Sequence, residues 1–146
     1  MKTEIRISKT EPEARAILVA PKLSPELEQA WRFLEGIGTN RITGFWEGKA
    51  MILDPTKILR IWAEDDDVYA RTENETFRLK NRLYEIESRL DPTSFVRISR
   101  SEIINLDQAE SFDLSLMGTI EIRMKDGHRS YVARRNVKKL KEVLGV

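Results

Sequence analysis

The chain has 146 residues, of which 40% are hydrophobic and 34% are charged, and it contains no cysteine. This length fits one ordinary domain, and the balance of residue types is typical of a soluble globular protein, which excludes a disordered or fibrous chain. Without a thiol, the chain can form no disulfide framework and no zinc finger, which suits a reducing compartment. Residues 1–20 contain no apolar run long enough for a signal peptide or a membrane-spanning helix, so we expect neither there, and we expect a cytoplasmic protein.

The formal net charge of +1 conceals an uneven distribution of charge along the chain. Residues 51–94 carry seven basic and ten acidic side chains, whereas residues 95–146 carry ten basic and seven acidic ones. Between His128 and Lys141 there are six basic side chains and no acidic one. This local excess of positive charge favours an anionic partner at one face of the protein.

Residues 1–50 are predicted to form a small ββα unit that precedes the main domain at residues 51–146. Residues 3–8 alternate between polar and apolar side chains and residues 14–20 form a short apolar run, and both patterns predict strands. A helix is predicted from Ser24, because serine can cap it, proline suits its first position and apolar residues recur at helical spacing until Gly-Ile-Gly. The unit is interpreted as a dimerisation or regulatory surface, or as additional core.

The middle of the chain reads as a series of strands that indicates an antiparallel meander. A turn at Gly48 and the acidic run from Glu64 to Asp67 separate some of the strands. From Lys80, apolar residues at helical spacing predict one short helix that ends at Asp91 and Pro92. The predicted strands cover residues 41–47, 50–54, 57–64 and 68–74.

The last third is predicted to be strands followed by a basic helix. Strands are expected at residues 102–106, 109–116 and 119–125, and Asp126 with Gly127 predicts a tight hairpin turn. The return strand leads directly into Arg-Arg-Asn, and Asn136 is predicted to cap the final helix.

The sequence offers little support for catalysis, and we expect no enzyme and no cofactor. His128 is interpreted as a solvated turn residue, and no nucleophile elbow, phosphate loop or dinucleotide fingerprint occurs. The acids from Glu64 to Asp67 could hold magnesium in a metal-dependent nuclease, but four consecutive acids are more typical of a solvated hairpin loop. Trp31, Trp46 and Trp62 fit core packing better than a stacking platform for single-stranded nucleic acid.

Two separated clusters of basic and polar side chains remain as candidate binding residues. Arginine presents a planar fork that reads guanine or clamps phosphate, and hydroxyl groups bind phosphate oxygens. By composition alone, solvated loop charges explain these clusters better than a nucleic-acid site does. The first cluster is Arg97, Ser99, Arg100 and Ser101, and the second is Arg134, Arg135, Asn136, Lys138 and Lys139.

From about Asp54 to Val146, the order of these motifs resembles the LytTR family of bacterial DNA-binding domains. The resemblance rests on an aromatic-x-Arg-x-Ser-Arg-Ser core at residues 95–101, an apolar-Asn strand end after it, and a terminal hairpin that closes in Arg-Arg before a basic helix. It implies a mainly β fold of three small antiparallel sheets with short helices. It also implies a transcription regulator that binds double-stranded DNA through loops in the grooves, without a recognition helix.

The resemblance places Arg100 and Ser101 in a first DNA-reading loop, which Arg97 and Ser99 flank. Bidentate hydrogen bonding by an arginine to a guanine edge contributes about 1 to 3 kcal/mol of discrimination. The acidic run from Glu64 to Asp67 stands where the family can insert a polar or basic residue into a groove. Because phosphates repel these acids, we expect no base contact from them.

The second DNA-reading loop implied by the resemblance holds Arg135, with Arg134 beside it. Asn136 and Lys138 match positions that hold the DNA backbone, and Lys139 continues the basic stretch. The serine that usually precedes Arg-Arg in the family is Ala133 here, so one hydroxyl group that could contact phosphate is missing.

The expected partner is promoter DNA, bound by a homodimer on repeated half-sites, because two short loops provide little contact area for full specificity. About 50 residues before the domain are too few for a receiver domain, so phosphorylation by a histidine kinase is not expected. Compact members of the family are often encoded beside a small membrane protein that restrains them, and such an inhibitor is a hypothesis for this chain. The alternative from another class is a protein-interaction or inhibitor module with a basic face.

Overall fold

The computed structural model describes residues 1–36 and 41–146, and Gly38, which was predicted to help end the first helix, lies outside them. The described helices are α1 (Pro25–Gly36), α2 (Leu83–Glu87) and α3 (Arg134–Leu144). The described strands are β1 (Ile42–Trp46), β2 (Lys49–Leu53), β3 (Arg60–Glu64), β4 (Asp67–Arg71), β5 (Thr76–Leu79), β6 (Phe95–Ser99), β7 (Glu102–Asn105), β8 (Ala109–Asp113), β9 (Glu121–Met124) and β10 (Arg129–Tyr131).

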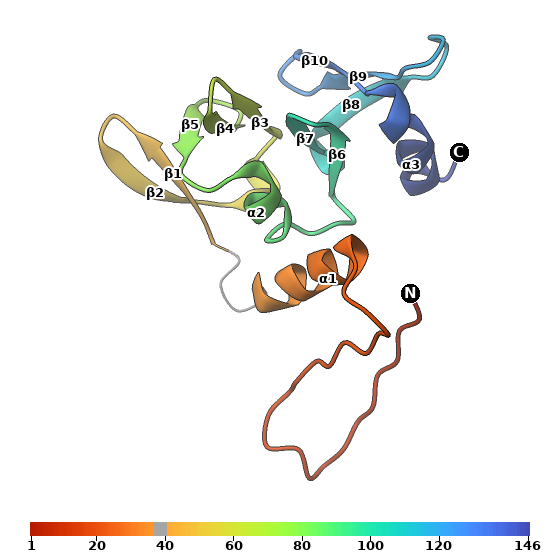
Figure 1. The fold of residues 1–146 in the computed structure, drawn as a ribbon. Coiled ribbons are helices and arrows are strands. Elements are labelled where there is room, and N and C mark those ends of the chain that lie inside the picture. The colour runs from red at the N-terminus through yellow and green to blue at the C-terminus, as the bar shows by residue number, and fades with distance from the viewer. Residues whose placement is uncertain (37–40) are drawn as a thin grey trace.

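The described strands form two antiparallel sheets (Figure 1). One has seven strands in the order β2-β1-β5-β4-β3-β7-β6, and the other has three in the order β10-β9-β8. The mainly β architecture with short helices is thus confirmed. The described residues contain two sheets where the resemblance implied three, because β3 pairs with both β4 and β7 and so joins two strand groups into one sheet.

The β6–β7 hairpin separates two hydrophobic cores. Phe95 and Ile103 belong to the first core, which α2 covers, whereas Val96, Ile98 and Ile104 belong to the second core, which α3 covers. Successive residues of a strand point to opposite faces, so this hairpin contributes to both cores at once. Burying one such aliphatic side chain stabilises the fold by roughly 1.5 to 3 kcal/mol.

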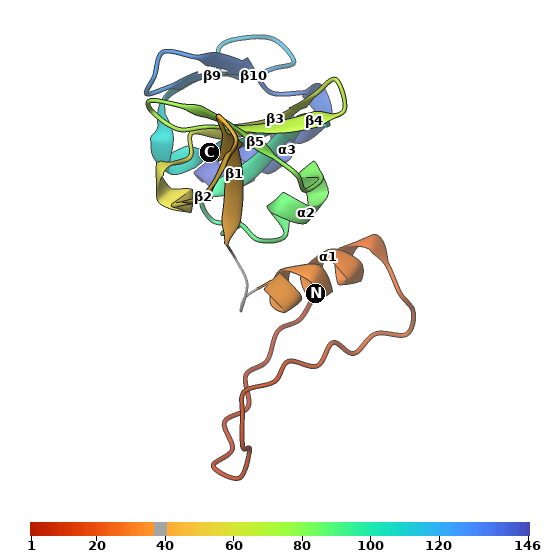
Figure 2. The ribbon, with the colours of Figure 1, turned by 90° about the vertical axis from the view of Figure 1, so that its left-hand side faces the viewer.

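Residues 1–24 form no strand, so the two strands predicted for the N-terminal ββα unit are wrong. Ile5, Ile7, Ile17 and Val19 are exposed instead, and Figures 1 and 2 show this segment projecting from the sheets as a wide open loop. An alternating pattern specifies a strand only where another strand pairs with it and one face can be buried. In this chain no described strand pairs with the segment.

The predicted helix of the N-terminal unit is confirmed as α1, which lies below the sheets and near α2 (Figure 2). The hydroxyl of Ser24 accepts a hydrogen bond from the backbone N–H of Leu27 at 3.1 Å, which satisfies one of the free donors at the start of the helix. The guanidinium group of Arg32 lies 5.0 Å from the centre of the Tyr84 ring in α2. The contact between Arg32 and Tyr84 links α1 to α2.

The tryptophans were expected in the core, and that expectation is wrong for Trp31 and Trp46, which are 54% and 37% exposed. Trp46 ends β1, whose neighbour β2 is the edge strand of its sheet and is itself mostly exposed. Trp31 lies on α1, on a side that packs against no core cluster of the described residues. Trp62 is half-buried and stacks on Tyr69 with ring centres 5.6 Å apart.

Candidate nucleic-acid interface

The first candidate loop is the turn between β6 and β7. Arg100 and Ser101 are the two residues of this turn, and both are exposed. Ser99, at the end of β6, accepts a hydrogen bond on its hydroxyl from the backbone N–H of Ser101 at 3.3 Å. The turn therefore presents one guanidinium group and one hydroxyl group to solvent.

Arg97 braces this turn from behind. Its Nη1 donates a hydrogen bond to the backbone carbonyl of Arg100 at 2.6 Å, and its Nε donates to Glu87 in α2 at 2.9 Å. Arg97 lies on the same face of β6 as Phe95, which is the face that α2 covers. Because its Nε and Nη1 both donate to groups of the protein, and Nη1 bonds the backbone of Arg100, Arg97 acts as a support for Arg100.

The second candidate loop is the start of α3, where Arg134 and Arg135 form the first turn and are exposed. The prediction that Asn136 caps this helix is wrong. The capping residue is Ala133, which has the extended backbone of a cap but no side-chain acceptor, and Asn136 lies inside the first turn. Two cations at an uncapped helix start are unfavourable for the helix itself, since the helix dipole favours negative charge there.

The structure brings the two loops together although they are distant in the sequence. The backbone N–H of Ala133 donates to the carbonyl of Ile98 at 2.8 Å, and the side-chain amide of Asn136 donates to the carbonyl of Arg97 at 3.4 Å. Leu140 is fully buried in the core that also contains Ile98. The start of α3 is therefore held beside the end of β6, which brings the two loops close together.

The two lysines of the second cluster occupy different sides of α3. Both are exposed, but Lys139, together with Val143 one turn later, lines a cavity that faces α1. Lys138 lies four residues after Arg134, and residues at this spacing share one side of a helix. Lys139 lies at the same spacing after Arg135, so each lysine shares one side of α3 with one of the two exposed arginines.

A network of partly buried polar side chains behind the first loop was not predicted. Glu102, which follows the β6–β7 turn, accepts hydrogen bonds from Arg60 in β3 at 3.1 Å and from the hydroxyl of Ser130 in β10 at 2.7 Å. The guanidinium group of Arg60 also lies 3.9 Å from the centre of the Trp62 ring. Glu102 thereby ties the three-stranded sheet to the seven-stranded sheet, just behind the two candidate loops.

His128 lies near this network and is half-buried, so the interpretation of a solvated turn residue is wrong. Burial lowers the pKa of His128 below its ordinary value, and the nearby positive charge of Arg60 lowers the pKa further. The turn at Asp126 and Gly127 itself is confirmed, but the hairpin folds back onto the larger sheet, where Asp126 lies 3.8 Å from Arg71.

The acidic run is divided by a hairpin turn. Asp65 and Asp66 form the turn between β3 and β4 with φ of 49° and 68°, and Asp67 pairs with Arg78 at 3.1 Å. This confirms the interpretation of the run as a hairpin loop. Within residues 1–36 and 41–146, no group of three or more histidine, cysteine, aspartate or glutamate side chains is placed to hold a metal ion. No helix in these same ranges is long and apolar enough to cross a membrane.

Comparison with known proteins defines the class of this chain. A family model described as the LytTr DNA-binding domain matches residues 48–145, which is more than half of the chain. The chain therefore belongs to the LytTR family of DNA-binding domains. Its mainly β architecture, its DNA-binding character and its role in transcription regulation follow from that membership, and the family is generally non-enzymatic.

Relatives of similar length support this assignment. The chain is 31% identical over 147 residues to uncharacterized HTH-type transcriptional regulators of Staphylococcus aureus strains NCTC 8325 and COL, and the match covers 100% of this chain and 99% of each relative. A solved LytTr DNA-binding domain from Bacillus cereus has the same fold, with a TM-score of 0.69 and 24% identity, over 73% of this chain and 97% of that one. In the described part of the present chain, strands separate α1, α2 and α3 in the sequence, so no two successive helices form a helix-turn-helix.

Proposed function

We propose that this LytTR protein is a sequence-specific regulator that binds duplex DNA through one surface, formed by the β6–β7 turn and the first turn of α3. The observation that carries the proposal is the hydrogen bonding of Ala133 and Asn136 to the end of β6, which places two exposed basic loops beside each other. An uncapped helix start that carries two arginines is a poor arrangement for stability alone, and phosphate oxygens would satisfy both its charges and its free N–H groups.

The proposed contacts divide into base reading and backbone binding. Arg100 and Arg135 are proposed to read base edges in the major groove, since a bidentate arginine contact distinguishes guanine from other bases. Phosphate contacts are proposed for Ser101, Arg134, Lys138 and Lys139, and these would fix the register of the protein on DNA and make binding depend on salt. Arg97, Ser99 and Asn136 are proposed to hold the two loops in place.

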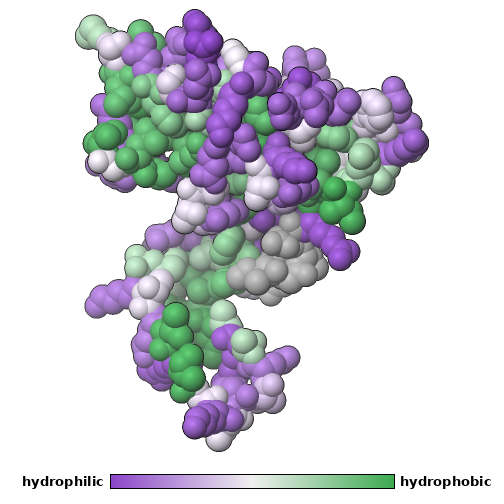
Figure 3. All heavy atoms as spheres, turned by 180° about the vertical axis from the view of Figure 1, so that it is seen from behind, coloured by the Kyte–Doolittle hydropathy of each residue, from purple (hydrophilic) through white to green (hydrophobic). Residues whose placement is uncertain are grey.

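The proposal includes a dimer on repeated half-sites. Two loops on one small domain contact few bases, and a second protomer multiplies the affinity without any new kind of contact. The N-terminal segment, residues 1–24, is the proposed dimerisation or regulatory surface, since it exposes β-prone apolar residues that have no partner strand among the described residues. Figure 3 shows apolar side chains at the surface of the lower part of the molecule, which contains this segment.

Two further proposals concern the partners and the site of action. We place the protein in the cytoplasm, where promoter DNA is accessible. A small membrane protein encoded nearby is proposed to restrain it, as the resemblance to compact family members suggested. Co-fractionation with membranes in cells that contain or lack the neighbouring gene product tests the restraint, and equal fractionation in both would contradict it.

The test of DNA binding is selection of bound sequences from a random duplex pool, followed by gel-shift titration at increasing salt. Enrichment of a repeated half-site and a steep loss of affinity with salt are expected. A protein-interaction module with a basic face would give neither result. A metal-dependent nuclease would cut labelled DNA in the presence of magnesium, whereas we expect the DNA to remain intact.

A further inference from the structure

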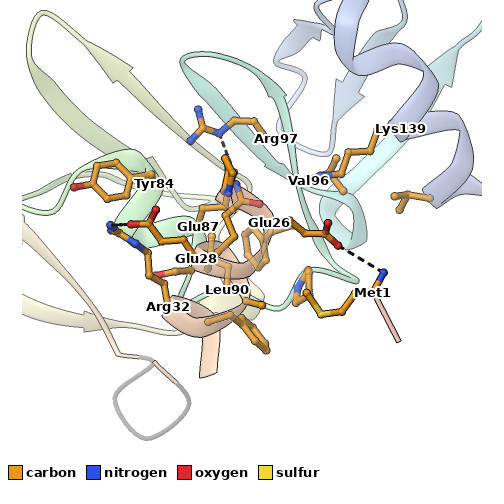
Figure 4. A pocket seen from close by; sticks show the side chains of 18 residues that line it. Met1, Glu26, Glu28, Arg32, Tyr84, Glu87, Leu90, Val96, Arg97 and Lys139 are labelled. Carbon is orange, nitrogen blue, oxygen red and sulfur yellow. Dashed lines mark hydrogen bonds and ion pairs between the residues drawn. The ribbon is translucent and has the colours of Figure 1, made fainter. Parts of the chain in front are cut away.

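A cavity of about 590 Å³ lies between α1 and the body of the domain (Figure 4). Phe33 of α1 lines one side, and the other side is formed by Leu90, Phe95 and Val96 with Val143 of α3. The volume falls within the range of ligand sites, which are commonly about 300 to 1,000 Å³ and mostly apolar with a few polar groups. The volume of this cavity and its apolar wall thus fit a small-molecule site.

The charged groups around the cavity leave one cation available. Three carboxylates line it, and each has a cation of this chain as its partner: Glu87 with Arg97 at 2.9 Å, Glu28 with Arg32 at 2.7 Å and Glu26 with the N-terminal amine at 3.8 Å. Lys139 lines the same cavity, and no carboxylate of the residues that the structure describes lies within 4.0 Å of its ammonium group. The α3 side of the cavity therefore offers an uncompensated positive charge next to an apolar wall.

We propose that this cavity binds a small amphipathic monocarboxylate, such as a medium-chain fatty acid. The carboxylate pairs with the ammonium group of Lys139, and the apolar body lies against Phe33, Leu90 and Phe95. A cationic ligand would be repelled by Lys139 and would find, among the described residues of the lining, no carboxylate that lacks a partner. A fully polar ligand would lose the water bound to its polar groups, and the apolar wall offers no hydrogen bonds in return. An amphipathic monoanion satisfies both features of the lining.

The site is connected to both proposed DNA-reading loops, and this regulatory step rests on the proposed function. A carboxylate bound to Lys139 competes with the phosphate that Lys139 is proposed to contact, so the ligand weakens DNA binding. On the opposite side, Glu87 lines the cavity and holds Arg97, which in turn bonds the backbone of Arg100. A ligand in the cavity therefore acts directly on α3, and it acts on the β6–β7 turn through Arg97.

Calorimetric titration of the full chain with decanoate tests the site, with decyltrimethylammonium as the probe of reversed charge. We expect one decanoate per chain, and binding of the cation at least tenfold weaker. Ala30→Trp, which fills the cavity from α1, should weaken decanoate binding at least tenfold. Lys139→Gln should weaken it at least threefold, while Lys141→Gln, the same change on the same helix outside the cavity, should leave it unchanged.

Equal affinity for the two probes, or unchanged decanoate binding in Lys139→Gln, overturns the proposal. Lys139 is exposed, so its variant tests the site even where Ala30→Trp does not fold, and thermal unfolding checks the folding of both. Decanoate should also lower the affinity for selected DNA at least threefold in the parent chain. If DNA affinity stays constant with decanoate bound, the regulatory step fails. If decanoate binds and no DNA sequence is selected, the proposed function fails and the ligand site stands.

Discussion

At the scale of single residues, Arg97 and Arg100 are two arginines of one motif with different surroundings. Arg100 is exposed at the tip of the turn, whereas Arg97 is half-buried and bonded to Glu87 and to the carbonyl of Arg100. The sequence placed both in one cluster, because composition cannot distinguish an arginine that faces solvent from one that is used inside the fold. The difference depends on which face of β6 the α2 helix covers.

If Arg100 and Arg135 read bases as proposed, replacing either should reduce the discrimination between target and random DNA without reducing the stability of the protein. Arg100→Ala and Arg135→Ala should each reduce the preference for target over random DNA by about 1 to 3 kcal/mol. Lys138→Ala should weaken binding to both kinds of DNA about equally and lower the salt dependence. Gel-shift titrations on target and random duplexes measure both quantities, and parental behaviour in all three variants would refute the assignment.

The brace assignment predicts a different result for Arg97→Ala. This change leaves Glu87 and the carbonyl of Arg100 without their partner, so the free energy of unfolding should fall by about 0.5 to 1 kcal/mol, since a partly exposed ion pair contributes little more. Urea unfolding measures this difference. Arg100→Ala is the matched control and should unfold like the parent, because no ion pair of Arg100 occurs among the described residues.

His128 predicts a pH dependence of stability. Its pKa in the folded protein is lowered from the ordinary 6.5, so the unfolded chain binds the proton more readily than the folded chain does. Stability contributed by neutral His128 is therefore present above about pH 6.5 and is lost as the pH falls from there through the folded pKa. In urea unfolding at pH 7 and about pH 5.5, His128→Gln should lose less stability than the parent between the two values. Equal losses would contradict the assignment.

At the scale of elements, the start of α3 shows where local rules were insufficient. Asparagine is a common cap, and that preference predicted a helix start at Asn136. The hydrogen bond from Ala133 to Ile98 instead fixes the chain in extended form up to Ala133, and the helix begins at the next residue. A backbone hydrogen bond between distant segments thus decided the boundary, and such a contact is not visible in a local pattern.

A capping side chain at position 133 should stabilise the protein. Ala133 has φ of −61° and ψ of 141°, which suits a capping residue, but it has no acceptor for the free N–H groups of α3. Ala133→Ser should raise the free energy of unfolding by about 0.5 to 1 kcal/mol. Ala133→Val, which adds volume without an acceptor, is the control. A serine variant no more stable than the valine variant would show that the missing cap is not a weakness of this helix.

The strands differ in how well the alternation of polar and apolar residues could predict them. The strands from Ile42 to Arg71 were predicted because turn residues separate them and one face of most of them is buried. The same alternation of polar and apolar residues in residues 3–8 gave no strand. Such a pattern is compatible with a strand, but a strand forms only where a neighbouring strand is present to pair with it. The polar network of Arg60, Glu102 and Ser130 also could not be predicted, because strand register alone brings these residues together.

At the scale of the whole molecule, the two cores of the described chain contain no residue before Ile42. The DNA-binding part therefore has the burial it needs to fold independently of the N-terminal segment. Family membership was predictable from the sequence, because motif order survives where side-chain packing changes. The arrangement of α1 over a cavity could not be predicted from the sequence, since none of the contacts in that arrangement follows a short-range pattern.

Removal of the N-terminal segment should separate folding from assembly. A chain that lacks residues 2–22 keeps Ser24 as the cap of α1 and both cores, so urea unfolding should remain cooperative with a nearly unchanged midpoint. Binding to a single half-site should persist, whereas the gain from a second half-site should disappear. The double variant Ile5→Ser, Ile17→Ser in the full chain is the control and should show the same loss. If a second half-site raises the affinity of both proteins as much as that of the parent, the N-terminal segment does not form the dimer contact.

The hydrogen bond between Ala133 and Ile98 has a consequence for the DNA as well as for the protein. It fixes the end of β6 beside the start of α3, and both of the proposed reading loops adjoin the core that contains Ile98 and Leu140. If DNA binds to both loops as proposed, the double helix would have to bend or twist until its grooves meet both of them. The energy of that deformation depends on base steps that no side chain contacts, since pyrimidine–purine steps bend readily and A-tracts resist bending. Promoters would thus be distinguished by stiffness between the contacted bases as well as by the bases themselves.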